Sequence, residues 1–304
     1  IAALHAASNV KVLTRTVCWG RFDGNTLAAH QSVDGKVRQN YHKEQAKKII
    51  IAAGAIERPL VFGNNDKPNV MLASAARRML NHYGTATGKL LAVFTNNDSA
   101  YQTAFDYADA GIKVSALVDS RQYPSQTLVD GCQSRGIILH TQSVVTEAKG
   151  WQAVRSIEIA DLAANGQSVS NRRRVACDVL AHSGGWTPQV QMASHGGKPP
   201  VFDKKIAAFV VGDQAPDTYS VGAAEGESNL LVNVSQAVDA AKAACAELGA
   251  EAGAVTPPPQ DREGTSNIVP LWSVPAKGKQ MVDIQHDVTA ADVVQSHREG
   301  FVSV

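Results

Sequence analysis

The sequence predicts an α/β protein in which one strand–helix–strand domain is inserted into another. An apolar strand, Lys48–Ala53, ends in the small residues Ala52-Ala53-Gly54-Ala55. A strand–helix–strand unit spans 89–119, and a later apolar strand ends in Ser183-Gly184-Gly185. Strand ends without bulky side chains let a ligand or a crossing segment approach the backbone closely. Two such ends on either side of an α/β unit indicate two nested Rossmann domains.

Length and composition exclude several other classes. At 304 residues the chain is long enough for about two domains. Its 29 basic and 28 acidic residues nearly balance, which gives no electrostatic reason to expect nucleic acid or a membrane surface as a partner. The basic run Arg172-Arg173-Arg174 is expected to be the solvated start of a strand. No apolar run approaches the ~20 residues of a transmembrane helix.

The cysteines and the chain ends carry further expectations. Cys18, Cys132, Cys177 and Cys245 are far apart and form no C-x-x-C motif. They therefore offer neither a redox dithiol nor metal-ligand spacing, and they indicate a reducing, cytoplasmic location. The chain begins with Ile1 inside an apparent helix, so we expect an internal fragment of a longer polypeptide.

The first half of the chain predicts a strand pair followed by a parallel α/β unit. Asp-Gly and Asn punctuation within 9–36 favours a small antiparallel pair. The three isoleucines of Lys48–Ala53 indicate a buried, parallel-type strand. A short helix over Ser74–Tyr83 comes next. The apolar runs Lys89–Asn96 and Lys113–Asp119 then flank a helix over Ser99–Ala110 and complete one βαβ unit.

The second half alternates further helices and strands. Its predicted elements, in order, are a helix over Thr127–Arg135, a strand over 136–145, a hairpin within 151–180, a buried strand over Val175–His182, a short strand over Thr218–Gly222 and an alanine-rich helix over Asn233–Leu248. The Asn165-Gly166 pair is a strong hairpin turn signal.

These elements suggest a domain division. We expect 1–67 and 186–250 to form an outer dinucleotide-binding domain, and 68–185 an inner Rossmann-like domain. A Pro-, Gly- and charge-rich linker is expected over 251–279, and 280–304 opens a small ferredoxin-like α+β unit. The alternative is a single doubly wound domain, but two separate strand-plus-hairpin units favour nesting.

The inner domain lacks the glycines of a working dinucleotide loop. Such a loop brings backbone N–H groups against a pyrophosphate at a helix N-terminus. Here the turn reads TNNDSAY, Thr95 to Tyr101, and Asp98 stands where a phosphate would bind. Asp119 ends the next strand, where a ribose-binding acid normally lies, although alone it is expected to be a solvated strand end. We therefore expect the inner domain to keep the fold without the nucleotide site.

A second candidate loop, TYSVGAAEG, follows the strand over Thr218–Gly222. Small residues lead into the helix that begins near Asn233, whose N–H groups and dipole are expected to face a ligand pyrophosphate. The alternative is a strand–helix turn that needs small residues only for packing. In the remaining candidate, SGGWTP, the neighbouring His182 and His195 are assigned no catalytic role.

Several segments carry resemblances to known families. AAGAIERP resembles the run with which flavin and nicotinamide disulfide-reductase-like proteins leave the nucleotide domain. Together with NDKPNVMLASAARRML, VFTNNDSAY, SGGWTP, VGAAEG and VDIQHDVTAADVVQSHREGFVSV, it resembles the alpha subunit of heterotetrameric sarcosine oxidase. The resemblance runs in order over nearly the whole chain, and VFTNNDSAY and SGGWTP are its specific elements.

The resemblance implies a concrete function. That family demethylates sarcosine with oxygen and tetrahydrofolate to glycine, hydrogen peroxide and methylenetetrahydrofolate, in complexes with beta, gamma and delta subunits. It implies a non-covalent NAD in the alpha subunit, and FAD and FMN held through the beta subunit. The glycine loop and the folate domain would lie outside Ile1–Val304. The fragment alone is then expected to be inactive, and no catalytic residue is assigned in it.

The same resemblance implies which residues contact the cofactor. The adenine-side contact falls near Cys18, and later contacts fall at or near Ala223, Ser228 and Leu230. Ala53, Gly54 and Gly222 complete the implied cofactor-binding set. Flavin proteins of this class have Gly-Asp where this chain has Gly222-Ala223, and the acid bonds the ribityl chain of FAD. NAD has no ribityl chain, so the change favours NAD.

The segment over 282–289 also lacks functional residues that related subunits have. Related amine dehydrogenase subunits have a V-C-x-C-x-x-V-T segment that ligates an iron–sulfur cluster. Here Asp283 and Gln285 occupy the cysteine positions, so no cluster or other metal is expected. A capping box starts a helix at Thr289.

Two other functions stay open. An independent NAD(P)H-dependent FAD oxidoreductase needs a glycine loop in the inner domain and Gly-Asp at the flavin site, and the sequence has neither. A non-binding scaffold subunit is the third possibility.

Overall fold

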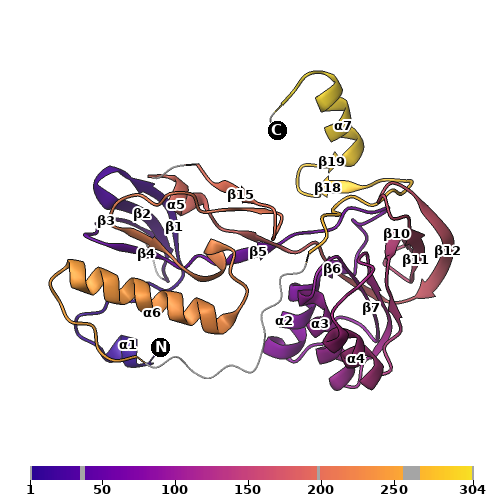
Figure 1. The fold of residues 1–304 in the computed structure, drawn as a ribbon, viewed down its shortest axis with the longest axis horizontal. Coiled ribbons are helices and arrows are strands. Elements are labelled where there is room, and N and C mark those ends of the chain that lie inside the picture. The colour runs from indigo at the N-terminus through magenta and orange to yellow at the C-terminus, as the bar shows by residue number, and fades with distance from the viewer. Residues whose placement is uncertain (1, 35–37, 197–198, 256–267, 303–304) are drawn as a thin grey trace. The chain divides into compact units, whose positions relative to one another are not determined.

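The computed structural model describes residues 2–34, 38–196, 199–255 and 268–302, and it divides into two compact units (Figure 1). Unit 1 is formed by Ile1–Ala55, Pro188–Asp203 and Ala208–Gly264. Unit 2 is formed by Ile56–Thr187, Lys204–Ala207 and Thr265–Val304. Each unit is therefore built from segments that are distant in the sequence.

Unit 1 combines a β-meander, a parallel strand pair and a long helix. Its elements are α1 (Ala2–Ala6), β1 (Thr16–Phe22), η1 (Asp23–Asn25), β2 (Thr26–Ser32), β3 (Gln39–Gln45), β4 (Ile49–Ile51), α5 (Gln191–Ser194), β15 (Val201–Asp203), β16 (Ala208–Val210), β17 (Thr218–Ser220), η2 (Gly222–Glu225) and α6 (Leu230–Glu247). Strand β2 pairs antiparallel with both β1 and β3. Strands β4 and β17 pair in parallel, with Ile49 opposite Thr218 and Ile51 opposite Ser220.

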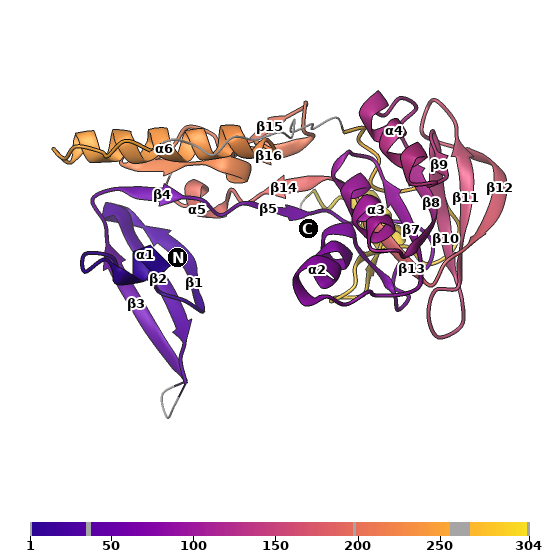
Figure 2. The ribbon, with the colours of Figure 1, turned by 90° about the horizontal axis from the view of Figure 1, so that it is seen from below.

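Unit 2 is built around a five-stranded parallel sheet of order β6-β13-β7-β8-β9. These strands are β6 (Val70–Leu72), β13 (Val179–Ser183), β7 (Leu90–Thr95), β8 (Lys113–Asp119) and β9 (Leu139–His140), and the helices α2 (Ala73–Tyr83), α3 (Ser99–Asp109) and α4 (Gln126–Ser134) accompany them. An antiparallel sheet is formed by β10 (Ser143–Lys149), β11 (Ser156–Leu162) and β12 (Val169–Ala176). Helices α2–α4 cover one face of the parallel sheet and β10–β12 cover the other (Figure 2).

The alternation of side chains along β7 explains these three layers. Leu91 and Val93 belong to a buried cluster with residues of α2, α3 and α4. Ala92 and Phe94 belong to the opposite cluster, with Ile157 and other residues of the antiparallel sheet. Successive side chains of a strand point to opposite faces, so a continuous apolar run fills both cores at once.

The chain passes between the units near β5 (Ala55–Glu57) and β14 (Trp186–Pro188), which pair with each other. The last elements are β18 (Met281–Asp283), β19 (Val288–Thr289) and α7 (Ala290–Arg298). Helix α7 starts with the expected capping box, in which Thr289 and Asp292 bond each other's backbone. Residues 256–267 of the expected linker lie outside the described residues. Its second half packs on unit 2, where Val274 is buried and donates its N–H to Val61 O.

The structure differs from the expected elements at several places. The expected strand over 136–145 is two strands, because β9 joins the parallel sheet and β10 the antiparallel one. Strand β3 was not predicted, because its sequence QNYHKEQ has no apolar pattern and is mostly exposed. The short hairpin of β15 and β16 was not predicted either. Arg172, Arg173 and Arg174 lie inside β12, where the first two pair with Glu158 and Asp161.

The core of unit 2 generates a stability prediction. Phe62 is fully buried, with its ring 5.9 Å from Phe94 and 5.5 Å from His182 between centroids. Replacing it by alanine, Phe62→Ala, is expected to lower the free energy of unfolding by about 3–5 kcal/mol, measured by denaturant unfolding. The exposed Ile138 of the same unit is the control, and Ile138→Ala is expected to cost less than about 1 kcal/mol. Equal losses in the two variants would contradict this packing.

Candidate functional site

Unit 1 contains a cavity of about 620 Å³, a volume typical of sites for small molecules and cofactors. Small apolar residues make up most of its wall. The lining residues are Ala52, Gly54, Val221, Gly222, Ala223, Asn233, Val234, Ala237, Val238, Ala241, Lys242, Cys245, Glu251, Ala252, Gly253 and Val255. Three of the sequence-predicted site residues, Gly54, Gly222 and Ala223, are therefore brought together.

The parallel strands β4 and β17 explain why these three residues meet. Both strands end at the same edge of their sheet, and the carboxyl edge of parallel strands is the usual ligand position in α/β proteins. Gly54 and Gly222 follow these ends with φ of 75° and 74°, a left-handed conformation that favours glycine. A Cβ at Gly54 would meet nothing within 4 Å, so at this point the wall is open backbone.

One face of α6 forms the opposite wall. Asn233, Ala237, Ala241 and Cys245 are spaced by four residues and all line the cavity. The Asn233 Oδ1 atom is buried and has no hydrogen-bond partner in the described chain. A buried carbonyl oxygen without a donor costs free energy, and it marks a place where a ligand donor would be stabilised. This wall was not predicted, although the sequence shows its small side chains at every fourth residue.

The start of α6 differs from the expectation. The helix begins at Leu230, three residues before the expected Asn233, because Asn229 caps it. The Asn229 side chain accepts hydrogen bonds from the N–H groups of Leu231 and Val232, at 2.9 and 3.2 Å. The first N–H groups of this helix were expected to face a pyrophosphate, but in the observed first turn those of Leu231 and Val232 are satisfied within the chain.

The other predicted cofactor residues lie outside the cavity lining. Cys18 is exposed on β1. Ala53 is exposed beside the lining residues Ala52 and Gly54. Ser228 and Leu230 are exposed at the beginning of α6. Four of the seven predicted residues thus lie outside the cavity lining, although Ala53 is adjacent to it in the chain.

An ionic cluster fixes the C-terminal end of α6 to the strand pair. Lys48, next to β4, donates to Asp217 Oδ1 at 2.6 Å and also pairs with Glu247 at the end of α6. Tyr219 Oη donates to Glu247 Oε1 at 2.7 Å. The bonds from Lys48 and Tyr219 hold the pKa of the Glu247 carboxyl below its usual range. This cluster positions the helix that forms the cavity wall.

The inner nucleotide position in unit 2 is occupied by a buried arginine. Arg121 Nη1 lies 2.5 Å from Asp98 Oδ1, and Arg121 Nη2 lies 2.7 Å from Asp119 Oδ2. All three side chains are at most 8% exposed. Burial acts to lower the pKa of Arg121, but the bonds to Asp119 and Asp98 outweigh it and the pKa is raised. The guanidinium therefore lies between the two acids that a dinucleotide would face.

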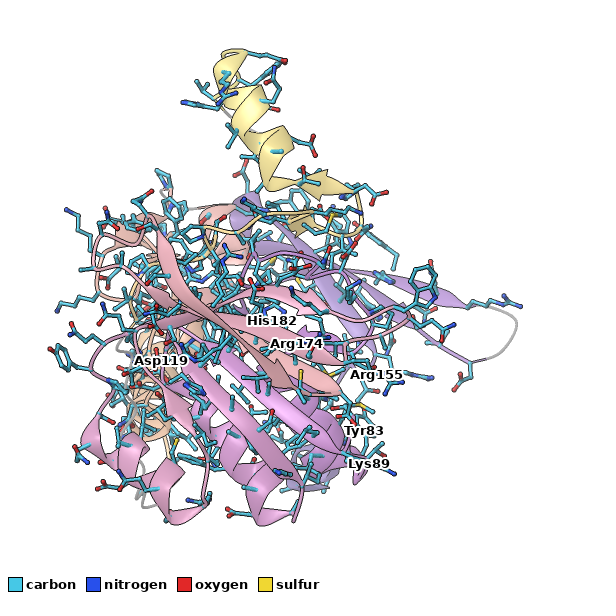
Figure 3. All side chains as sticks on the ribbon, turned by 90° about the vertical axis from the view of Figure 1, so that its right-hand side faces the viewer. Tyr83, Lys89, Asp119, Arg155, Arg174 and His182 are labelled. Atoms are coloured by element: carbon cyan, nitrogen blue, oxygen red, sulfur yellow. The ribbon has the colours of Figure 1, made fainter. Side chains whose placement is uncertain are left out.

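Asp119 corrects one expectation. It was expected to be a solvated strand end, but it is fully buried and accepts a hydrogen bond from Tyr101 Oη at 2.7 Å. Asn97 Oδ1 accepts from Ser99 N and Oγ, which closes the turn on itself. In Figure 3, Asp119 lies at the opposite end of the parallel sheet from Lys89, which precedes β7. The carboxyl end of this sheet is therefore filled by its own side chains.

Two histidines accept backbone hydrogen bonds. His182, labelled in Figure 3, receives the Leu60 N–H at its Nδ1 at 3.0 Å, and His195 receives the Arg21 N–H at 3.3 Å. Burial lowers the pKa of His182 to about 4, so the ring is neutral at physiological pH with its proton on Nε2. Both contacts join segments that are distant in sequence.

The segment over 282–289, in which Asp283 and Gln285 occupy the cysteine positions of related cluster-binding subunits, brings no group of metal ligands together. Asp283 Oδ2 lies 2.7 Å from His286 Nδ1, and its other oxygen accepts from Gln285 N. Among the described residues, no three His, Cys, Asp or Glu side chains are placed to hold a metal ion.

None of the described helices combines the length and the apolar character that crossing a bilayer requires.

Comparison with solved structures defines the class as a disulfide-reductase-like FAD/NAD(P)-binding fold. The thioredoxin reductase of T. acidophilum matches with a TM-score of 0.57 and 17% identity, over 80% of this chain and 76% of that one. The L-proline dehydrogenase of P. horikoshii matches with a TM-score of 0.56 and 15% identity, over 97% of this chain and 54% of that one. The predicted fold class is confirmed. No protein-family model matches the chain.

Sequence comparison confirms the particular resemblance. The chain is 35% identical to sarcosine oxidase subunit alpha of Rhizobium meliloti (strain 1021), over 99% of this chain and 30% of that protein. It is 33% identical to sarcosine oxidase subunit alpha of Corynebacterium sp. (strain P-1), over 100% of this chain and 33% of that protein. The chain thus matches about a third of the length of these sarcosine oxidase alpha subunits.

The arginine between Asp98 and Asp119 generates a second prediction. Arg121→Met leaves two buried carboxylates unpaired and is expected to lower the free energy of unfolding by about 3–5 kcal/mol. Arg172→Met, which removes the partly exposed pair with Glu158, is the control and is expected to cost less than about 1 kcal/mol. Denaturant unfolding measures both. If Arg121→Met cost no more than the control, the buried triad would be refuted.

A third prediction concerns pH. The folded pKa of His182 is about 4 against about 6.5 in the unfolded chain, so the unfolded state binds more protons between these values. The stability that neutral His182 contributes is complete above pH ~6.5 and is lost as pH falls toward ~4, by on the order of 3 kcal/mol.

The measurement is the free energy of unfolding from pH 7 to 4 in the natural protein and in His182→Gln, which cannot titrate. The variant is expected to have a flatter slope in this window. The exposed His297 on α7 is the control, and His297→Gln is expected to keep the natural slope. An unchanged slope in His182→Gln would contradict a neutral buried imidazole.

Proposed function

We propose that unit 1 holds a non-covalent NAD in the cavity between the ends of β4 and β17 and the side of α6. The observation that carries the proposal is the convergence of Gly54 and Gly222 with the unpartnered Asn233 Oδ1 on one cavity of about 620 Å³. The glycines leave the backbone accessible to a ligand, and the buried Asn233 Oδ1 atom would be stabilised by a hydrogen bond from a ligand donor. These features fit a dinucleotide at the carboxyl edge of a parallel strand pair.

The residues of the cavity have distinct proposed roles. Gly54 and Gly222 admit the ligand to the backbone, and Asn233 accepts a hydrogen bond from it. Lys242, also in the lining, supplies a positive charge for a phosphate. Ala223 adds no carboxylate to the wall, which favours NAD over FAD. NAD supplies hydride chemistry where a substrate faces its nicotinamide; here we propose a structural role.

We further propose that the chain is part of the alpha subunit of a sarcosine-oxidase-type complex. The support is the match to three proteins named sarcosine oxidase subunit alpha at 32–35% identity. In this proposal the complex oxidises sarcosine with oxygen and tetrahydrofolate. The FAD and FMN chemistry lies with the beta subunit, gamma and delta subunits complete the complex, and a separate domain binds the folate.

A fourth prediction tests the cofactor. The natural protein, purified with whatever domains and subunits accompany this chain, is denatured with acid and the released ligand is identified by chromatography. Stoichiometric NAD released from this subunit is expected. FAD from this subunit would instead favour the independent flavin oxidoreductase, and no nucleotide would favour the scaffold. Either result would overturn the NAD proposal.

A pair of α6 variants locates the site. Ala237→Leu fills the cavity from a lining position, keeps a strong helix former and is expected to reduce NAD occupancy at least about tenfold. Ala243→Leu makes the same change at an exposed α6 position outside the lining, and NAD is expected to be retained. Equal occupancy in the two variants would place NAD elsewhere.

A further inference from the structure

A second cavity lies within unit 2, and its lining, which includes Ser99 of the turn over 95–101, is strongly polar. It measures about 320 Å³, enough for about ten water molecules, and is lined by Glu57, Ser74, Arg77, Arg78, Asn81, His82, Ser99, Thr103 and Trp186. Two arginines and a histidine face a single carboxyl group in this lining. We propose that this cavity binds a small oxyanion, the carboxylate or phosphate group of an organic ligand.

One face of α2 supplies the positive side of the cavity. Ser74, Arg77, Arg78 and Asn81 follow a spacing of three and four residues, so they lie on one helix face. An adjoining face buries Ala73 and Ala76 in the core. The packing of α2 therefore places Arg77 and Arg78 together on the side that lines the cavity.

The two arginines have unused hydrogen-bonding capacity. Arg77 Nε donates to Asp106 Oδ2 at 2.6 Å, and in the described chain its two terminal nitrogens make no hydrogen bond. Asn81 and Gln102 also donate to Asp106, which fixes α2 against α3. No described carboxylate pairs with Arg78, which is exposed. A guanidinium fork with free N–H groups matches the two oxygens of a carboxylate or phosphate.

The other side of the cavity is rigid and internally satisfied. Trp186 Nε1 donates to Ser99 Oγ at 3.0 Å, and Ser99 Oγ donates to Asn97 Oδ1 at 2.6 Å. Thr103 Oγ1 donates to Ala73 O at 3.1 Å. These groups shape the cavity, while the arginines keep donors for a ligand.

Glu57 is the one acid in the lining and does not neutralise the arginines. It is 5% exposed, and its Oε2 accepts the Ser74 N–H at 2.8 Å near the start of α2. Burial raises the pKa of Glu57 above its usual range, against the opposing effect of its hydrogen bonds with Ser74 and Ser183. A carboxyl group held in this way is part of the wall. The lining thus has two guanidinium groups and one carboxyl group, and Asp106, which pairs with Arg77, lies outside the lining.

The test titrates the natural protein with sodium phosphate and with sodium malonate, at an ionic strength held constant with sodium chloride. Tryptophan fluorescence reports binding, and melting temperature gives a second readout. We expect saturable changes with at least one anion. Tighter phosphate binding would indicate a phosphorylated ligand and tighter malonate binding a carboxylate ligand. No saturation with either would overturn the proposal.

Variants assign the response to this cavity. Arg78→Gln is expected to raise the dissociation constant at least about fivefold. Arg155→Gln removes an exposed arginine of the same unit that is absent from the lining, and it is expected to bind as the natural protein does. Trp186→Phe is expected to lose the fluorescence change and keep the shift in melting temperature. Equal weakening in both arginine variants would show a nonspecific charge effect and refute the site.

Glu57→Gln tests whether the negative charge of Glu57 takes part in binding. Glutamine retains an oxygen for the Ser74 N–H and removes the negative charge, so anion affinity is expected to be unchanged or higher. Weaker anion binding in Glu57→Gln with normal anion binding in Arg78→Gln would mean that the arginine does not hold the anion, and the proposal would fail.

Discussion

Arg121 lies between Asp98, in the turn after β7, and Asp119, at the end of β8, and the three side chains are almost completely buried. Removing Arg121 would leave two buried carboxylates without a counter-charge, which is among the costlier changes a fold can undergo. The pair of salt bridges therefore ties the turn after β7 to the end of β8. We infer that the contacts that keep the fold of the inner domain also occupy the position where a lost nucleotide site was expected from the sequence.

In unit 1, by contrast, the ends of the parallel strands open onto a cavity. Its parallel strands β4 and β17 are followed by Gly54 and Gly222, which have left-handed φ values. Its cavity is lined mostly by small side chains and includes the unpartnered Asn233 Oδ1 atom. The ion pairs of Lys48 hold the C-terminal end of α6 through Glu247, and Asn229 caps its N-terminal end. Within one chain, an α/β edge without glycines is occupied by its own side chains, and an α/β edge with glycines remains open.

Much of this could be predicted from local sequence. The apolar runs of β7 and β8, the Asn165-Gly166 turn and the Thr289 capping box depend on neighbours in sequence, and they were predicted with small errors in their ends. Arg121 could not be placed in this way, because its partners meet only through the parallel register of β7 and β8. The same holds for Asn233, whose burial depends on tertiary packing. Asn229 was a readable N-cap signal that would have placed the start of α6 correctly.

We propose that the described part of this chain has an open dinucleotide site in unit 1 and an inner position closed by Arg121 in unit 2. Hydrogen–deuterium exchange of the natural protein, stripped of nucleotide and then measured with and without saturating NAD, tests it most directly. The account predicts slower exchange on NAD addition at 52–55, 221–223 and along α6, with no change at 95–101 and 119–121. Protection of 95–101 and 119–121 by NAD, with none in unit 1, would contradict it.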